Sequence, residues 1–212
     1  MTTRICFIRH GETDWNVARR IQGQTDIPLN ETGRSQALAM AMAFNAAHYD
    51  FSAVYSSDLE RAVDTAKMVA EKRGLEVSTT PLLRERHFGI FQGLTAEEGL
   101  QRNPAAHACY EARDLDYDFD SGESLLQFAD RVKAAVDYLT QHHRNQTIAA
   151  VTHAGVLDIL YRNATGRPLQ APRDFAVPNC ALNWFRFDEN GWHLEAWDDH
   201  HHLARVLMES AE

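Results

Sequence analysis

The sequence has few cysteines and no long apolar run. Its three cysteines, Cys6, Cys109 and Cys180, form an odd and widely spaced set without a C-x-x-C pair. Such a set excludes a disulfide framework and is typical of a reducing compartment. No stretch is apolar over a membrane-spanning length, and no signal-peptide core precedes the first apolar segment. We therefore expect a cytoplasmic protein without a membrane partner.

Positive charge is also scarce. The chain has 30 Asp and Glu against 21 Lys and Arg, and its formal net charge is −9. Because nucleic acids and anionic membranes require a broad basic surface, this balance argues against both as partners. If such a protein binds an anion, it must do so through a local cluster of cations.

Internal repeats, low-complexity tracts and linkers are absent as well. A length of 212 residues with 44% hydrophobic residues is ample for one buried core, and we predict a single domain over residues 1–212. Periodicity is poor only at about 88–121, which we interpret as an inserted flap. Its aromatic side chains suit either flap packing or a substrate pocket: Phe88, Phe91, Tyr110 and Tyr117.

The sequence does contain a repeated junction between a buried strand and a helix. The apolar residues 5–8 stop at Arg9 and His10, and the apolar residues 147–152 stop at His153. Arg61 falls in the first turn of the helix that follows a short strand at 53–55. Ligands of a parallel sheet lie at the carboxyl ends of its strands, so we expect these four side chains to gather at one edge.

The remaining pattern predicts an α/β fold. Strand and helix segments alternate, which favours a mostly parallel sheet. Residues 181–188 and 192–197 alternate around Asn190 and Gly191, which predicts an antiparallel edge hairpin. Residues 56–58 look like the N-cap of one helix, and residues 120–123 resemble a capping box before another.

Two arginines and two histidines at one sheet edge favour phosphate chemistry. Guanidinium forks bind phosphate oxygens bidentately, and a neutral imidazole is a competent nucleophile toward phosphorus. Glu85, in the loop before the flap, can then protonate the departing alkoxide. Phosphoryl transfer needs mainly positioning and charge neutralisation, which these side chains supply without a metal or another cofactor.

Two competing patterns are weaker. Cys180 and Arg186 satisfy the bare C-x5-R spacing of cysteine phosphatases, but the residues between them contain no glycine and look like a strand, so we reject the match. The run Asp198, Asp199, His200, His201, His202 is a poor metal site, because consecutive residues rarely converge on one ion. We predict no metal site.

Short motifs occur in a fixed order along nearly the whole chain. They are R-H-G-E-T-x-x-N at residues 9–16, Q-G at 22–23, S-S-D-L-E-R-A at 56–62, L-R-E at 83–85, G-E-S at 122–124 and V-T-H-A-G at 151–155. In this order they resemble the histidine phosphatase superfamily, whose fold is phosphoglycerate-mutase-like. The resemblance implies a three-layer αβα sandwich.

The resemblance also implies roles for individual residues. His10 corresponds to the nucleophile that becomes phosphohistidine, Arg9, Arg61 and His153 to the phosphate pocket, and Glu85 to the proton donor. Four further residues correspond to substrate contacts: Asn16 on the phosphate, Gln22 and Gly23 near the rest of the substrate, and Ala154, which replaces a glycine often seen after the second histidine. Asp158 stands where an arginine is frequent, and we expect it to lie behind the pocket with little catalytic consequence.

The family contains both phosphatases and mutases, and the short, acid-rich flap favours a phosphatase. It lacks the adjacent arginine pair with which mutases grip the carboxylate of phosphoglycerate. We expect a metal-independent histidine acid phosphatase, a phosphoric monoester hydrolase whose only partner is a small-molecule phosphomonoester. Phosphoglycerate mutase is the alternative, and Glu85 counts against a non-catalytic phosphate-binding module. The sequence leaves the oligomeric state open, including a homodimer.

Overall fold

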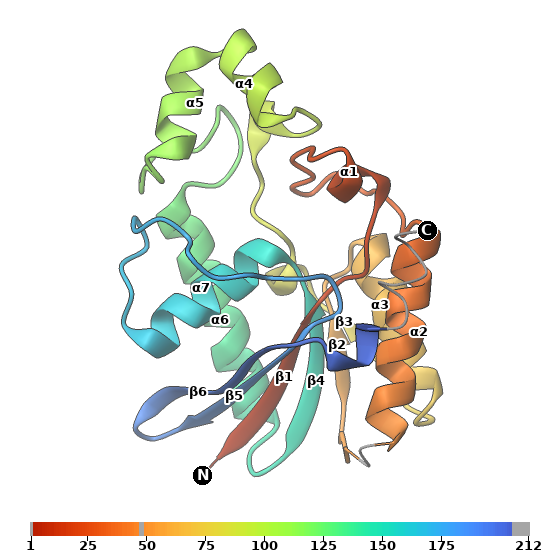
Figure 1. Cartoon of the computed structure of the whole chain (residues 1–212). Helices are drawn as coiled ribbons and strands as arrows, with labels where there is room; N and C mark the ends of the chain where they lie inside the picture. The colour runs from red at the N-terminus through yellow and green to blue at the C-terminus, as the bar shows by residue number, and fades with distance from the viewer. Residues whose placement is uncertain (1, 47–48, 205–212) are drawn as a thin grey trace.

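The strands and helices of this chain build a three-layer αβα sandwich, shown in Figure 1 as a computed structural model that describes residues 2–46 and 49–204. Within those residues the strands form one sheet in the order β3-β2-β4-β1-β5-β6. They are β1 (Thr3–Arg9), β2 (Val54–Ser56), β3 (Val77–Thr79), β4 (Thr147–Thr152), β5 (Leu182–Asp188) and β6 (Gly191–Asp199). The first four in spatial order pair in parallel, and β5 and β6 pair antiparallel at the edge.

Helices cover both faces of the sheet. They are α1 (Asp14–Val17), α2 (Glu31–Ala46), α3 (Glu60–Glu71), α4 (Ala96–Arg102), α5 (Pro104–Glu111), α6 (Leu125–His142) and α7 (Ala154–Thr165), with short 3-10 turns at Pro81–Leu83, Gly89–Phe91 and His201–Leu203. Helices α6 and α7 pack on one face, and α2 and α3 on the other (Figure 1). No helix in the described ranges combines the length and the apolar character needed to cross a membrane.

Strand β1 shows why the sheet is buried on both sides. Successive side chains of a strand point to opposite faces. Ile5 and Phe7 therefore enter the core under α6 and α7, whereas Cys6 and Ile8 enter the core under α2 and α3. All four are fully buried, as the sequence predicted for a central strand of a parallel sheet.

The predicted hairpin is confirmed. Strands β5 and β6 are joined by the turn at Glu189 and Asn190. Gly191 follows with φ of 115°, a backbone conformation that residues other than glycine rarely adopt. The hairpin continues the sheet beyond β1, so β1 and β4 become its most central strands.

Both predicted helix caps are wrong by a few residues. Helix α3 is capped by Leu59 without a side-chain hydrogen bond, because Asp58 instead accepts a bidentate pair from Arg84 at 2.7 and 2.6 Å. Helix α6 is capped by Ser124, in a capping box with Gln127. Glu123, which the sequence suggested as the capping acid, pairs with a side chain of α6 instead, as described below.

The flap stands over the carboxyl ends of the strands (Figure 1). Helices α4 and α5 and the following loop form a small core of their own around the buried rings of Phe91 and Phe119. Sequence analysis missed α5, although Asn103 and Pro104 are a helix-start signal: the Asn103 side chain accepts from the backbone of Ala106.

Candidate active site

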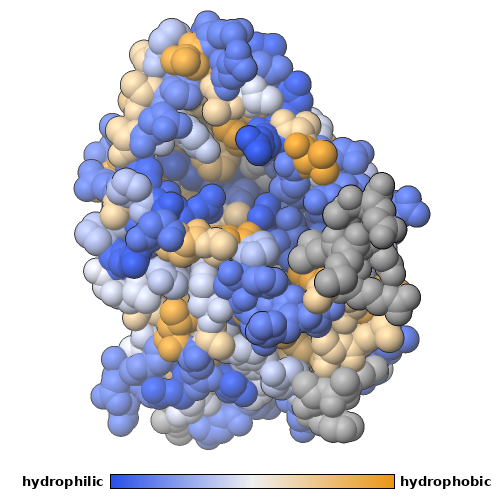
Figure 2. Space-filling model, in the orientation of Figure 1, coloured by the Kyte–Doolittle hydropathy of each residue, from blue (hydrophilic) through white to orange (hydrophobic). Residues whose placement is uncertain are grey.

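A cleft of about 540 Å³ lies between the flap and the carboxyl edge of the sheet. Figure 2 shows it as the hollow below the upper part of the molecule. All nine residues predicted for the site line this cleft except His153, which lies fully buried beside His10. The lining predicted residues are Arg9, His10, Asn16, Gln22, Gly23, Arg61, Glu85 and Ala154.

His10 lies at the floor of the cleft and is only 3% exposed. Its Nδ1 lies 2.7 Å from the Gly11 carbonyl oxygen, which can only accept, so Nδ1 carries the proton and Nε2 keeps its lone pair. Burial, together with the charges of Arg61 and Arg9, lowers the pKa of His10 well below its ordinary value. The imidazole is thus neutral at neutral pH, the form that can act as a nucleophile.

His153 is placed beside His10 by the register of two strands. Arg9 of β1 pairs with Thr152 of β4, so the next residues on the two strands are neighbours, and the two rings lie with centroids 5.1 Å apart. Neither ring nitrogen of His153 has a hydrogen-bond partner within the described residues. Burial and the charge of Arg61 lower its pKa too. Such unpaired buried polar atoms are costly, and they mark a place for a ligand.

The two predicted arginines are anchored from behind. Arg9 donates from Nη1 to the carbonyl of Val177 at 2.6 Å, and Arg61 donates from Nη1 and Nη2 to the carbonyls of Thr25 and Gly23. Burial lowers the pKa of each arginine to about 10, so both stay charged near pH 7. In each, Nε is buried and without a partner in the part of the chain that the structure describes. Both cations therefore retain donors for an anion.

Three predicted substrate contacts come from the segment after β1, which contains α1. The Oδ1 atom of Asn16 caps Thr13, which leaves the Nδ2 donor of Asn16 unused by the described residues. Gln22 is 8% exposed, and its Oε1 has no partner in residues 2–46 or 49–204. Gly23, next to it, has φ of 53°, and a Cβ there would lie 2.1 Å from Oε1 of Gln92. Glycine at that position lets the loop follow this path without strain and without displacing Gln92.

Glu85 reaches the cleft with both carboxyl oxygens held by backbone amides. Oε1 accepts from the Arg86 N–H at 2.8 Å, and Oε2 accepts from the Gly155 N–H at 3.0 Å. Each oxygen has a further lone-pair site, so the group can keep both contacts whether or not it carries a proton. A Cβ at Gly155 would lie 2.1 Å from Oε1 of Glu85. Glycine at 155 is therefore needed for this placement, whereas Ala154 lines the cleft without such a clash.

The structure contradicts the expectation that Asp158 lies behind the pocket. Asp158 is one helical turn after Ala154 on α7, so it shares the face that lines the cleft. It accepts from Arg113 of the flap at 2.5 Å and from Arg162 at 3.0 Å. An ion pair at this position therefore ties the flap to α7.

Four further arginines line the cleft and were not predicted for the site: Arg20, Arg86, Arg113 and Arg173. Arg20 makes a bidentate pair with Glu98, and Arg113 pairs with Asp158, which it shares with Arg162. Arg86 donates to two backbone carbonyls, and burial lowers its pKa to about 10. Arg173 makes no hydrogen bond or ion pair with any described residue, and it is solvent-exposed. Each of these arginines lies on a separate segment, so no local sequence pattern identifies them as residues of one site.

Residues of the rejected patterns lie outside this cleft. Cys180 is fully buried, which raises the pKa of its thiol far above the ordinary value, and Arg186 pairs with Asp188 on the edge hairpin. Among the described residues, no three His, Cys, Asp or Glu side chains are grouped so that they could hold a metal ion.

The chain matches the model of the histidine phosphatase superfamily (branch 1) over residues 5–200. It is 41% identical to phosphoglycerate mutase-like protein 4 of Arabidopsis thaliana, over 95% of this chain and 87% of the relative. It is 39% identical to a metal-independent phosphoserine phosphatase of the same plant, over 96% and 84%. The solved structure of YhfR from Bacillus stearothermophilus superposes with a TM-score of 0.87 at 30% identity, covering 95% of this chain and 99% of that one. On these grounds the chain belongs to branch 1 of the histidine phosphatase superfamily.

Proposed function

We propose that this protein hydrolyses small phosphomonoesters through a phosphohistidine on His10. One observation carries the proposal: the free lone pair of His10 Nε2 faces a site where buried donors of Arg9, Arg61 and His153 all lack partners among the described residues. A phosphoryl group satisfies them together, because it presents three oxygens and a negative charge. The family and its phosphatase relatives support the same activity.

The reaction has two steps, phosphorylation of His10 and hydrolysis of the phosphohistidine. In the first, a bond forms between Nε2 of His10 and phosphorus, the bond from phosphorus to the ester oxygen breaks, and Glu85 gives its proton to the departing alkoxide. In the second, a water oxygen bonds to phosphorus, the bond to Nε2 breaks, and the Glu85 carboxylate takes a proton from that water. Arg9 and Arg61 neutralise the charge that spreads over the phosphoryl oxygens.

We propose further that preferred substrates carry a second negative group. A phosphoryl group fills only part of a cleft of about 540 Å³, and Arg173 at its outer end has no partner among the described residues. Arg173 and Arg9 line the same cleft, so one small molecule in it can contact both cations. Phosphoserine, named for a relative that is 39% identical, carries such a carboxylate.

Chelation tests the metal-independent chemistry. Because arginines and imidazoles supply the positive charge, we expect phosphate release to continue unchanged in excess EDTA. The assay is release of inorganic phosphate from a panel of phosphomonoesters, with and without the chelator. Loss of activity that a divalent ion restores would contradict the mechanism.

Substitution Arg173→Met tests the substrate class. We expect KM for phosphoserine to rise by about tenfold or more, the effect of losing one charge-assisted contact. 4-Nitrophenyl phosphate, which has no second anionic group, should be hydrolysed as before. Arg102→Met is the matched control, since Arg102 is an exposed flap arginine outside the cleft. Equal effects on both esters would remove Arg173 from substrate recognition.

Phosphoglycerate mutase is the second candidate, because one relative carries a mutase-like name. Incubation with 3-phosphoglycerate, with and without a bisphosphoglycerate primer, separates the two activities. Phosphate release supports the hydrolase, and primer-dependent formation of 2-phosphoglycerate supports the mutase.

The cellular setting follows from the same reasoning. We propose a cytoplasmic location, because the cytosol keeps thiols such as Cys6, Cys109 and Cys180 reduced. We propose a small-molecule phosphomonoester as the partner. A homodimer is compatible with this proposal, and measurement of the mass in solution tests it.

A further inference from the structure

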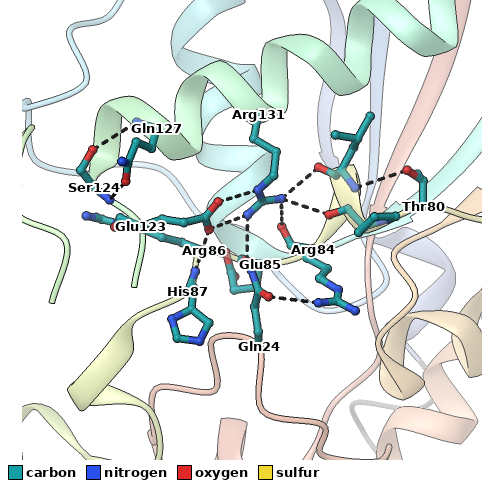
Figure 3. Close-up of polar contacts among 12 residues, drawn as sticks. Gln24, Thr80, Arg84, Glu85, Arg86, His87, Glu123, Ser124, Gln127 and Arg131 are labelled. Atoms are coloured by element: carbon teal, nitrogen blue, oxygen red, sulfur yellow. Dashed lines mark hydrogen bonds and ion pairs between the residues drawn. The ribbon is translucent and has the colours of Figure 1, made fainter. Parts of the chain in front are cut away.

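One side chain of α6 faces the loop that carries Glu85. Arg131 extends from the second turn of α6 toward residues 81–87 and is mostly buried there (Figure 3). On one edge its guanidinium donates from Nε and Nη2 to the two carboxylate oxygens of Glu123, each at 2.7 Å. This is a bidentate pair, the strongest and most directional form of an arginine contact.

The other edge of the same guanidinium holds the backbone before and at the acid. Nη1 donates to the carbonyls of Leu82 at 3.0 Å and Arg84 at 2.8 Å, with a longer contact to Pro81 at 3.4 Å. Nη2 donates to the carbonyl of Glu85 at 3.0 Å. A single side chain thus satisfies carbonyls along the whole approach to the acid.

Glu123 holds the backbone after the acid. Its Oε2 accepts from the His87 N–H at 2.9 Å, and its own carbonyl accepts from Nε of Arg86. Burial raises the pKa of Glu123, but the hydrogen bonds and the charge of Arg131, together with the His87 N–H, hold the pKa below the ordinary value. The carboxylate therefore stays charged, and the pair with Arg131 persists, near neutral pH.

We infer that Arg131 and Glu123 are positioning residues for the general acid Glu85, an inference that rests on the proposed function. The loop has only one 3-10 turn, Pro81–Leu83, before residue 85. The pair fixes the chain on both sides of Glu85, so its carboxyl group is directed into the cleft toward the Gly155 N–H. A misplacement of about 1 Å by a change remote from the chemistry can cost on the order of 10²-fold in rate.

A role of Arg131 in fold stability alone and a role in positioning Glu85 lead to different expected effects on activity. If Arg131 only stabilises the fold, its loss should lower activity on every ester by the same factor. If it positions the acid, the loss should fall on esters whose leaving alkoxide needs a proton. A nitrophenolate departs without one, so 4-nitrophenyl phosphate reports the active site without the acid.

The experiment compares kcat/KM for phosphoserine and for 4-nitrophenyl phosphate. The test variant is Arg131→Lys, which keeps a charge beside Glu123 but loses the fork that reaches the carbonyls. We expect a loss of about tenfold or more on phosphoserine and of less than about threefold on the nitrophenyl ester. Glu85→Gln provides the reference pattern, in the same direction and larger. Lys133→Met is the matched control, because Lys133 is exposed on the same helix and pairs with Asp137 rather than with the loop of Glu85.

Glu123→Gln repeats the test if Arg131→Lys fails to fold. Equal losses on the two esters, or no loss on either, for the variant that folds would overturn the positioning role, provided that Glu85→Gln itself is selective. Equal losses for Glu85→Gln would instead contradict the acid role of Glu85 in the proposed function, and the positioning role with it.

Discussion

A His10→Ala variant should form no phosphoenzyme and lose on the order of 10⁴-fold or more in kcat/KM, because removal of a nucleophile removes the covalent route altogether. The measurement is a rapid quench of the enzyme mixed with a phosphate-labelled monoester. In the active enzyme the label should stay on the protein in base and be lost in acid, as a phosphoramidate is. His10 is the described imidazole that both lines the cleft and has Nδ1 held by a backbone carbonyl, which leaves Nε2 for the attack.

Two comparisons give that experiment its controls. His142→Ala removes an exposed imidazole at the end of α6, which is not among the residues that line the cleft, and should leave the phosphoenzyme intact. His153→Ala should slow labelling but still allow it, because His153 donates to the phosphoryl group without bonding to phosphorus. A label that survives His10→Ala, or that resists acid, would place the nucleophile elsewhere.

Glu85→Gln should lower kcat/KM for alkyl phosphates by about 10²–10⁴-fold, the usual contribution of a positioned acid. The amide keeps the size of the side chain and one carbonyl acceptor, but it has no proton to give to the alkoxide. With 4-nitrophenyl phosphate the loss should be far smaller. Steady-state rates on a series of esters with leaving groups of graded basicity would show this as a steeper dependence in the variant.

Gly155→Ala offers an independent check on the same group. A Cβ at 155 would meet the Glu85 carboxyl, so this variant should show the same selectivity with the acid still present. If Glu85→Gln instead costs the same on every ester, Glu85 is not the acid. The carboxylate of Glu12, on the loop after β1, would then be examined next.

The central site was predictable because its signals are local. Each of His10 and His153 ends an apolar strand, and strands of this length and composition reveal themselves by sequence alone. The parallel register of β1 and β4 then brings the two rings together. Arg61 was found for the same reason, as it begins the helix behind a third strand.

The positions of the other arginines around the site were not predictable, because they depend on packing between segments that are distant in the sequence. Arg173 lies in the loop after α7, and Arg113 meets Asp158 across 45 residues of sequence. Arg131 gave one overlooked signal: it is a charged residue at the edge of the buried face of α6, between Phe128 and Val132 in the sequence. A cation there requires a partner, and Glu123 supplies it.

The burial of His10 affects which molecule, water or the alcohol, accepts the phosphoryl group from the phosphoenzyme. In-line displacement requires the acceptor to attack phosphorus opposite Nε2, and since His10 is buried at the floor of the cleft, that is the side by which the alcohol departs. Water therefore competes with the returning alcohol for one position, and hydrolysis wins when the alcohol leaves before it can react again. Hydrolase and mutase then differ in a residence time rather than in their bond-breaking groups. The contacts that hold the distal end of the substrate at the cleft mouth would set that time.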